Sequence, residues 1–332
     1  MKILVTGGAG FIGSHFVRYI LGQHPSYSVT NLDKLTYAGN PENLRDVEAD
    51  PRYRFVRGDI CDGKLVREVA RGVDAVVNFA AESHVDRSIM SAGEFVTTDV
   101  LGTFTLLETM REFQIPRAVF VSTDEVYGSI AHGGFKAPDP LHPSNPYAAS
   151  KAGADLLALA YWKTYRLPVL ITRSSNNFGP HQYPEKIIPL FITNALEDLP
   201  LPLYGDGKNV RDWLYVVDNV AAIDLVLHQG APGEVYNVGG GAEVENIVLT
   251  RKILRLLGKP ESLIQPVKDR PGHDRRYALD SGKLRALGWR ATHGFDDALA
   301  RTVGWYREHE AWWRPLKSGE FKKYYEQQYV KR

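Results

Sequence analysis

Apolar runs and helical spacings alternate along the first half of the chain. The opening segment passes from an apolar run, Ile3 to Val5, through a glycine-rich turn into a segment whose apolar residues recur at helical spacing up to Leu21. This order predicts a strand, a tight turn and a helix. Further strand-like segments follow at 28–33, 52–59, 74–81 and 117–123. The stretches between them are long enough for crossover helices, so the pattern predicts an α/β fold with a doubly wound parallel Rossmann sheet.

A long helix is predicted from Pro146 to about Tyr165. Asn145 can accept hydrogen bonds from the first turn, and proline suits the first helical position. Another apolar run, 168–173, predicts the next strand of the sheet.

The pattern changes after Asn176, where the periodicity weakens and turn signals multiply. Helices are still predicted near 185–197, 216–228, 245–257 and 295–309. We therefore expect a Rossmann domain over 1–175, to which some later segments return, and a smaller mixed α/β C-terminal lobe over 176–332. The aromatic and basic tail after Trp313 is either a partner contact or a docked or frayed end.

Composition narrows the function classes. The 332 residues are 44% hydrophobic and 24% charged, which excludes a disordered or collagen-like chain. The net charge of +1 gives no field to recruit a polyanion, so we expect no nucleic-acid partner. Apolar runs are far shorter than the roughly 20 residues of a membrane span, so we expect no membrane contact. One cysteine, Cys61, cannot form an intramolecular disulfide, which suits the cytoplasm.

Three glycines in the first turn predict a dinucleotide site. Gly7, Gly10 and Gly13 lie between a strand and a helix, where they allow the turn, the approach of a pyrophosphate and close helix packing. Asp33 ends the next strand, about 20 residues on, where a carboxylate accepts hydrogen bonds from ribose hydroxyls. Because that carboxylate repels a 2′-phosphate, NAD is favoured over NADP. Asp59 either meets the adenine or caps the next helix.

Candidate chemistry follows the strand that ends near Val121. Tyr147 and Lys151 lie one turn apart on the long helix, so a nearby ammonium, together with NAD⁺, favours a phenolate that can accept a proton. The segment Ser122-Thr123-Asp124-Glu125 lies at the carboxyl edge of the predicted sheet, where such folds bind ligands. Thr123 can hydrogen-bond a substrate hydroxyl there.

These motifs resemble those of a known family. TGGAGFIG, YAASK and STDEVYG resemble the extended short-chain dehydrogenase/reductase superfamily, and within it the dTDP-glucose 4,6-dehydratase family. Nearly the whole chain shares the resemblance, through FAAESHVDRSI (79–89), NNFGPHQYPEKIIP (176–189), PLYGDGKNVRDWLYV (202–216) and DRPGHDRRYALD (269–280).

The resemblance implies a reaction on dTDP-glucose that gives dTDP-4-keto-6-deoxyglucose and water. C4 is oxidised, water leaves from C5 and C6, and the hydride returns to C6, so that NAD is recycled. Tyr147 and Lys151 serve the oxidation with Thr123, while Glu125 is the base at C5 and Asp124 the acid at the C6 oxygen. Two adjacent carboxyl groups in different protonation states suit such an elimination.

The resemblance also implies binding residues. Those for NAD are Gly7, Gly10, Phe11, Ile12, Gly13, Asp33, Lys34, Thr36, Asp59, Ile60, Phe79, Ala80, Ala81, Ser83, Thr98, Tyr147, Lys151 and Asn177. Those for the substrate are His84, Thr123, Asn176, Glu185, Lys186, Pro202, Tyr204, Arg211, Asn246, Arg270, His273 and Tyr277. Among the latter, arginine forks suit a diphosphate, and Tyr204 and Tyr277 are expected as aromatic walls. The Rossmann domain would hold NAD and the C-terminal lobe the nucleotide sugar.

Several questions stay open at this point. Asp99 stands where the family usually has Asn; it either faces the site and changes its charge or points into a hydrogen bond. No cluster of His, Cys and Asp has metal-ligand spacing, so we expect no metal. The superfamily resemblance implies a homodimer, and the small-residue face Ala148, Ala149, Ala152 and Gly153 either serves it or packs within the monomer.

Related functions compete with this prediction. A nucleotide-sugar 4-epimerase or a UDP-glucuronate decarboxylase shares the oxidation step but does not need the acid and base pair. A GDP-mannose 4,6-dehydratase runs the same chemistry with NADP, which Asp33 opposes. A non-catalytic NAD-binding protein on the same fold is a further alternative. The sequence leaves thymidine or uridine preference and the downstream pathway open.

Overall fold

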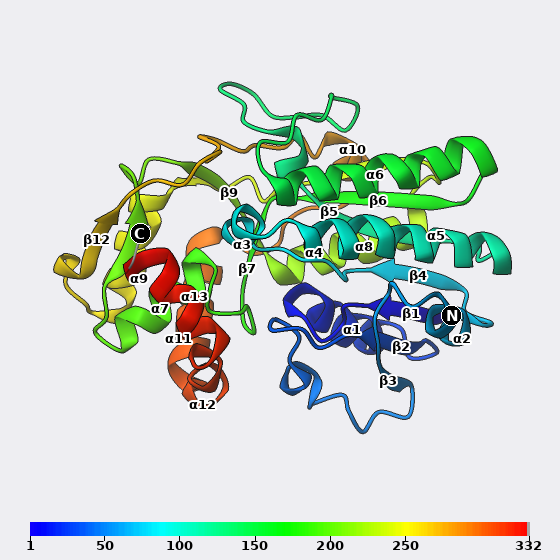
Figure 1. The fold of residues 1–332 in the computed structure, drawn as a ribbon, viewed down its shortest axis with the longest axis horizontal. Coiled ribbons are helices and arrows are strands. Elements are labelled where there is room, and N and C mark those ends of the chain that lie inside the picture. Colours follow the sequence, from blue (N-terminus) through cyan, green and yellow to red (C-terminus); the bar gives the residue numbers. More distant parts are fainter. Residues whose placement is uncertain (331–332) are drawn as a thin grey trace.

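The computed structural model describes residues 1–330, and its centre is a parallel sheet of seven strands (Figure 1). The strand order is β10-β6-β5-β4-β1-β2-β3, with every neighbouring pair parallel. The strands are β1 (Lys2–Thr6), β2 (Ser28–Asp33), β3 (Tyr53–Arg57), β4 (Ala75–Asn78), β5 (Ala118–Thr123), β6 (Val169–Ser174) and β10 (Val235–Val238). The predicted doubly wound Rossmann sheet is confirmed.

Helices cover both faces of this sheet (Figure 1). Successive side chains of β1 point to opposite faces, so Val5 packs beneath α1 (Phe11–Gln23) and α8 (Val216–Gln229), while Leu4 joins the core on the other side. That second core lies under α2 (Gly63–Ala70), α5 (Gly102–Phe113) and α6 (Pro146–Tyr165). Burial on both faces explains the apolar runs of the central strands, such as Ile3–Val5 in β1 and Ala75–Val77 in β4.

The predicted long helix is confirmed as α6. The Asn145 side chain accepts a hydrogen bond from the Ala148 amide at 2.9 Å, and Pro146 takes the first helical position. The four later predicted helices are α7 (Ile187–Leu196), α8, α9 (Asn246–Leu257) and α11 (Phe295–Glu308). Shorter helices are α3 (Val85–Met90), α4 (Gly93–Phe95), α10 (Gly282–Ala286), α12 (Glu310–Trp313) and α13 (Glu320–Tyr325).

A second layer of small sheets forms beyond the carboxyl edge of the main sheet. One has the order β11-β9-β7 and the other pairs β12 with β8. Their bounds are β7 (Asn176–Phe178), β8 (Leu201–Tyr204), β9 (Val210–Tyr215), β11 (Glu243–Glu245) and β12 (Ile264–Val267). They share an apolar core with α7, α9 and α11, and Phe321 of the tail is buried in it, so the tail docks.

Among residues 1–330, no helix combines the length and the apolar character that a bilayer span requires.

Candidate active site

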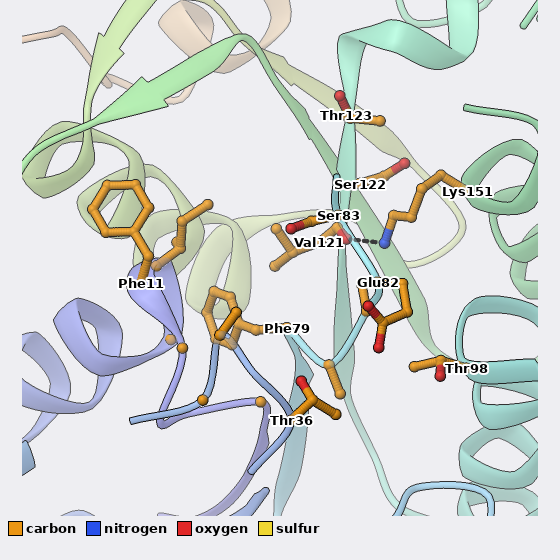
Figure 2. Close-up of a pocket in the computed structure, with 18 of the residues that line it drawn as sticks. Phe11, Thr36, Phe79, Glu82, Ser83, Thr98, Val121, Ser122, Thr123 and Lys151 are labelled. Carbon is orange, nitrogen blue, oxygen red and sulfur yellow. Dashed lines mark hydrogen bonds between the residues drawn. The ribbon is translucent and has the colours of Figure 1, made fainter. Parts of the chain in front are cut away.

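A pocket of about 280 Å³ opens where the strands of the main sheet end (Figure 2). The glycine turn, the ends of β2, β4 and β5, and the first turns of α6 line it. Every residue predicted to bind NAD lies in this lining. So do Thr123, Asp124 and Glu125, so the structure brings the predicted cofactor and catalytic residues together.

The glycine turn has a shape that only glycine allows. Gly7 has a φ of +72°, and a Cβ there would lie 2.5 Å from the Ala80 backbone nitrogen. A Cβ on Gly13 would overlap the Gly7 carbonyl oxygen. The helix α1 that follows has no side-chain cap at its N-terminus, which opens on the pocket. The turn therefore fits a pyrophosphate, as NAD would bring.

Two aspartates mark the far end of the pocket. Asp33 is 7% exposed and accepts hydrogen bonds from the amides of Ala9 and Leu35, both at 2.8 Å. Each carboxylate oxygen keeps a further lone pair for a ribose hydroxyl. Asp59 pairs with Lys34 at 2.9 Å. The capping alternative for Asp59 is excluded, because Asp62 caps the next helix.

The end of β5 carries the candidate acid and base. Thr123 is the last residue of the strand, and its hydroxyl accepts from the Glu125 amide at 3.3 Å and donates to Asp124 at 3.2 Å. Asp124 is 2% exposed. Burial and the neighbouring Glu125 carboxylate raise its pKa well above the usual range. Two adjacent carboxyl groups thus lie in different settings.

Tyr147 is buried beside this pair. Burial and the carboxylates of Glu125 and Asp99 raise the pKa of its phenol well above 10. Lys151 points towards the end of β5 and donates to the Val121 carbonyl at 2.8 Å (Figure 2). Burial and the two carboxylates thus outweigh any lowering of the Tyr147 pKa by this ammonium.

Asp99 points into hydrogen bonds rather than into the open pocket. Its carboxylate accepts from the Ser150 hydroxyl at 2.6 Å and from the Glu82 amide at 3.0 Å. Burial raises its pKa to about 6. Glu82, which the sequence did not single out, lines the pocket, and burial together with Asp99 raises its pKa to about 7.

An adjoining pocket of about 140 Å³ extends into the C-terminal layer. Glu125, Asn176 and Lys186 line both pockets, so the two are continuous at the catalytic residues. Of the residues predicted to bind substrate, this second pocket gathers His84, Asn176, Glu185, Lys186, Pro202, Tyr204, Arg211, Asn246, Arg270 and His273.

Tyr277 is the exception among the predicted aromatic walls. Its ring is 2% exposed and lies 4.3 Å beneath the Arg211 guanidinium, while its hydroxyl donates to Asp274 at 2.7 Å. Tyr277 is not part of either lining. The prediction that it forms a wall of the pocket is wrong, because the chain buries it behind the arginine that does face the ligand space.

The second pocket is rich in buried and half-buried cationic groups. Lys186 donates to the Ser83 carbonyl oxygen, and burial lowers its pKa. Arg211 donates to the Asp274 carbonyl at 3.0 Å, and Arg270 pairs with Asp86 at 3.1 Å. Glu185, expected near a sugar, also holds Arg87 at 3.0 Å. Such a set suits an anionic ligand.

Sequence reasoning missed several lining residues. The polar or aromatic ones of the second pocket are Asp86, Gln182, Phe191, Trp213 and Tyr329. Asp86 lies within the segment that carried the family resemblance, so position was a usable signal, whereas no spacing connects Tyr329 with the site.

One group of possible metal ligands lies outside both pockets. His24, Asp224 and His228 meet where α1 and α8 end, although no sequence spacing revealed it. The two imidazole rings stack at 4.9 Å and 22°, and each bonds to Asp224. Lone pairs lie in the ring planes, so nearly parallel rings do not converge on one ion.

A parallel Rossmann sheet with this pocket defines a nucleotide-binding enzyme of the extended short-chain dehydrogenase/reductase class. Residues 4–302 match the family model for GDP-mannose 4,6 dehydratase, and the chain belongs to that family. The resemblance that the motifs indicated is confirmed.

Individual relatives refine the comparison. The chain is 54% identical to dTDP-glucose 4,6-dehydratase of Streptomyces antibioticus over 96% of each. A crystal structure of the dTDP-glucose 4,6-dehydratase DesIV of Streptomyces venezuelae, with NAD bound, is 57% identical at a TM-score of 0.94, covering 96% of this chain and all of the other. The crystal structure of UDP-glucose 4-epimerase of Thermus thermophilus, in complex with NAD, is 34% identical at a TM-score of 0.86. The match covers 93% of this chain and all of the other.

Proposed function

We propose that this chain is an NAD-dependent dTDP-glucose 4,6-dehydratase, which converts dTDP-glucose into dTDP-4-keto-6-deoxyglucose and water. The observation that carries the proposal is the pair of Asp124 and Glu125 beside Tyr147, at the junction of the two pockets. The high identity to enzymes of that name over nearly the whole length supports it.

The first step is oxidation at C4 of the hexose. The glycine turn and Asp33 would hold NAD⁺, which would supply a hydride acceptor for C4 and a hydride source for C6. Tyr147 accepts the C4 hydroxyl proton, and Thr123 holds the C4 oxygen by a hydrogen bond. Lys151 contributes positive charge on the same helix face, which favours the phenolate in the loaded site.

The second step is elimination of water. The 4-ketone acidifies the C5 proton, which Glu125 removes, and Asp124 gives its proton to the departing C6 oxygen. Burial and Glu125 raise the pKa of Asp124, which favours the protonated form that can act as the acid. Glu125 recovers its negative charge when C5 is reprotonated. Asp124 then takes up a proton from solvent, which balances the proton that Tyr147 received from the C4 hydroxyl and releases.

The rivals explain less of the site. A 4-epimerase needs Tyr147 and the cofactor but has no use for a protonated Asp124 beside Glu125. A GDP-mannose 4,6-dehydratase that uses NADP conflicts with the buried Asp33 carboxylate at the ribose end of the pocket. The names of two relatives that are more than 50% identical favour thymidine over uridine.

The proposal also assigns a ligand to each domain, an oligomeric state and a compartment. The domain over residues 1–175, with β10 joining its sheet, holds the cofactor, and the lobe over 176–332 holds the nucleotide sugar. Two copies form a homodimer through the exposed side of α5 and α6. With a single cysteine and so no internal disulfide, the enzyme fits the reducing cytoplasm.

Purified protein mixed with dTDP-glucose in D₂O, with no NAD added, tests the function. We expect 4-keto-6-deoxy product that carries deuterium at C5, because the proton removed by Glu125 is replaced from solvent. Mass spectrometry and NMR follow the product. Epimerisation or decarboxylation of a UDP-sugar, with no product from dTDP-glucose even when NAD is added, would refute the proposal.

A further inference from the structure

A buried carboxylate outside the proposed reaction joins the two lobes at the substrate pocket. Asp86, on α3, is 3% exposed and accepts three hydrogen bonds. They come from Tyr204 at 2.8 Å, Arg270 at 3.1 Å and Tyr324 at 3.1 Å. All three donors lie more than 100 residues further along the chain, in the C-terminal layer and the tail.

This carboxylate stays charged despite its burial. Burial alone would raise the pKa of Asp86, but Arg270, His84 and the donated hydrogen bonds bring it down to about 2. A buried charge without its partner is costly, so the carboxylate and the Arg270 guanidinium fix each other in place. The negative charge therefore persists over the whole physiological pH range.

Arg270 is held by one end only. Its Nη1 donates to Asp86, whereas its Nε is buried and has no hydrogen-bond partner among residues 1–330. The side chain lines the second pocket together with His273 and Arg211. A planar guanidinium tethered at one nitrogen has further donors for a bidentate contact with a phosphate.

We propose that Asp86 is a positioning residue, which orients Arg270 so that the guanidinium binds the diphosphate of the nucleotide-sugar substrate. This inference rests on the proposed function, because it takes the ligand of the second pocket to be a nucleoside diphosphate sugar. Asp86 itself touches neither the reacting atoms nor the cofactor pocket.

The tail completes the same wall. Gln328 donates to the Tyr204 hydroxyl at 2.6 Å, and the Tyr204 hydroxyl in turn donates to Asp86. Tyr329 packs 5.9 Å from the Tyr204 ring and lines the pocket. One carboxylate thus sets both a phosphate-binding cation and the aromatic side chain next to it.

Asp86→Asn tests this role, since the amide keeps the volume and removes the charge. We expect the Kd of dTDP, measured by calorimetry, to rise about tenfold or more. In turnover, the KM of dTDP-glucose rises while kcat changes less, because the reacting groups stay in place. In an Arg270→Gln background, Asp86→Asn adds little further loss, since both changes remove the same contact.

A matched control separates positioning from simple stability. Asp155 is 2% exposed and pairs with Arg173 at 2.8 Å, outside both pockets. Asp155→Asn therefore lowers the melting temperature but leaves the Kd of dTDP at the wild-type value. Wild-type affinity for dTDP in folded Asp86→Asn would overturn the inference, as would full additivity with Arg270→Gln.

If Asp86→Asn does not fold, Asp86→Glu replaces it, because it keeps the charge but moves it by one methylene. A raised dTDP Kd is expected there too, and an unchanged one refutes the positioning role. The binding of dTDP needs no turnover. A wild-type protein that binds dTDP without converting dTDP-glucose would thus refute the proposed function. The dTDP affinities of the Asp86 variants would still test the positioning role.

Discussion

In the proposed reaction, Glu125 acts as the base and Asp124 as the acid of one elimination. Replacing Glu125 by Gln removes the base at C5 but leaves Tyr147 and Thr123 to oxidise C4. We expect formation of the 4-keto-6-deoxy product to fall by about 10²–10⁴-fold, while the absorbance of reduced nicotinamide builds up after dTDP-glucose is added. Rapid-mixing absorbance and product mass measure the two steps separately.

Tyr147→Phe provides the contrast for that variant. It removes the group that accepts the C4 proton, so neither reduced cofactor nor product forms. Equal absorbance of reduced nicotinamide in Tyr147→Phe and Glu125→Gln would contradict the assigned roles, because the two residues would then serve the same step.

Asp99 makes a prediction about stability. Burial raises its pKa to about 6, whereas an unfolded aspartate titrates near 4. The folded state holds its proton between these values, so stability falls as pH rises through the window, and the loss persists above it. Asp99→Asn avoids this cost, and its side-chain oxygen can still accept the hydrogen bond from the Glu82 backbone amide. We expect it to be more stable by about 3 kcal/mol at pH 8, a difference that narrows towards pH 4.

Urea unfolding across that pH range measures the effect. The exposed Asp297 on α11 gives the control, since Asp297→Asn removes a carboxylate without relieving burial. A less stable Asp99→Asn at pH 8, or a difference in stability that does not change with pH, would contradict the raised pKa of Asp99. Removing the Asp99 charge also lowers the pKa of Tyr147. We therefore expect the pH at which activity rises on the acid side of the pH profile to be lower in Asp99→Asn.

The β1–α1 unit tests the cofactor site at the scale of an element. Gly7→Ala places a Cβ within 2.7 Å of the backbone of Phe79 and Ala80, at a φ of +72°. Because the obstruction is backbone, the turn must shift. We expect a loss of stability of at least about 1 kcal/mol together with much weaker NAD binding.

Gly22→Ala adds the same methyl group to the same unit. A Cβ there meets nothing within 4 Å, and alanine favours a helix by up to about 1 kcal/mol, so this variant is at least as stable as the wild type. Thermal unfolding and NAD titration compare the two. Unchanged NAD affinity in Gly7→Ala would contradict the role given to the turn.

Elements differ in how far the sequence reveals them. The strands β1 to β6 and the helix α6 were predicted, because apolar runs mark the strands and because Asn145 and Pro146 mark a helix start. The strand β10, which joins the same sheet from the second half of the chain, was not predicted. The small sheets were not, since β7 and β11 have three residues each and depend on pairing with β9. A strand that short carries no period of its own.

Site residues follow the same division. The glycine turn and the end of β5 were found because the geometry of one strand and one turn places them. Asp86 was missed because its role depends on donors up to 238 residues away. Tyr277 was misplaced for a related reason, since a resemblance in sequence does not show that the Arg211 side chain lies over its ring.

At the scale of the whole molecule, the outer surface of α5 and α6 is unusually apolar. Val96, Leu101, Phe104 and Leu156 are 56%, 48%, 42% and 58% exposed, and they belong to the adjoining segments 96–113 and 146–165 (Figure 1). The small-residue face considered from sequence is only partly available, because Ala148 and Ala152 are buried within the monomer. Large exposed side chains rather than small ones therefore mark the proposed dimer surface.

Leu156→Glu tests that surface. A charge at the centre of a mostly apolar interface costs several kcal/mol in two copies, so we expect wild-type dimers and variant monomers at micromolar concentration. Leu256→Glu on α9 is the matched control, since Leu256 is 42% exposed on another part of the molecule, and that variant stays dimeric. Light scattering coupled to gel filtration measures the mass of each. A monomeric wild type would contradict the proposed dimer. A dimeric Leu156→Glu would show that the dimer forms through another surface.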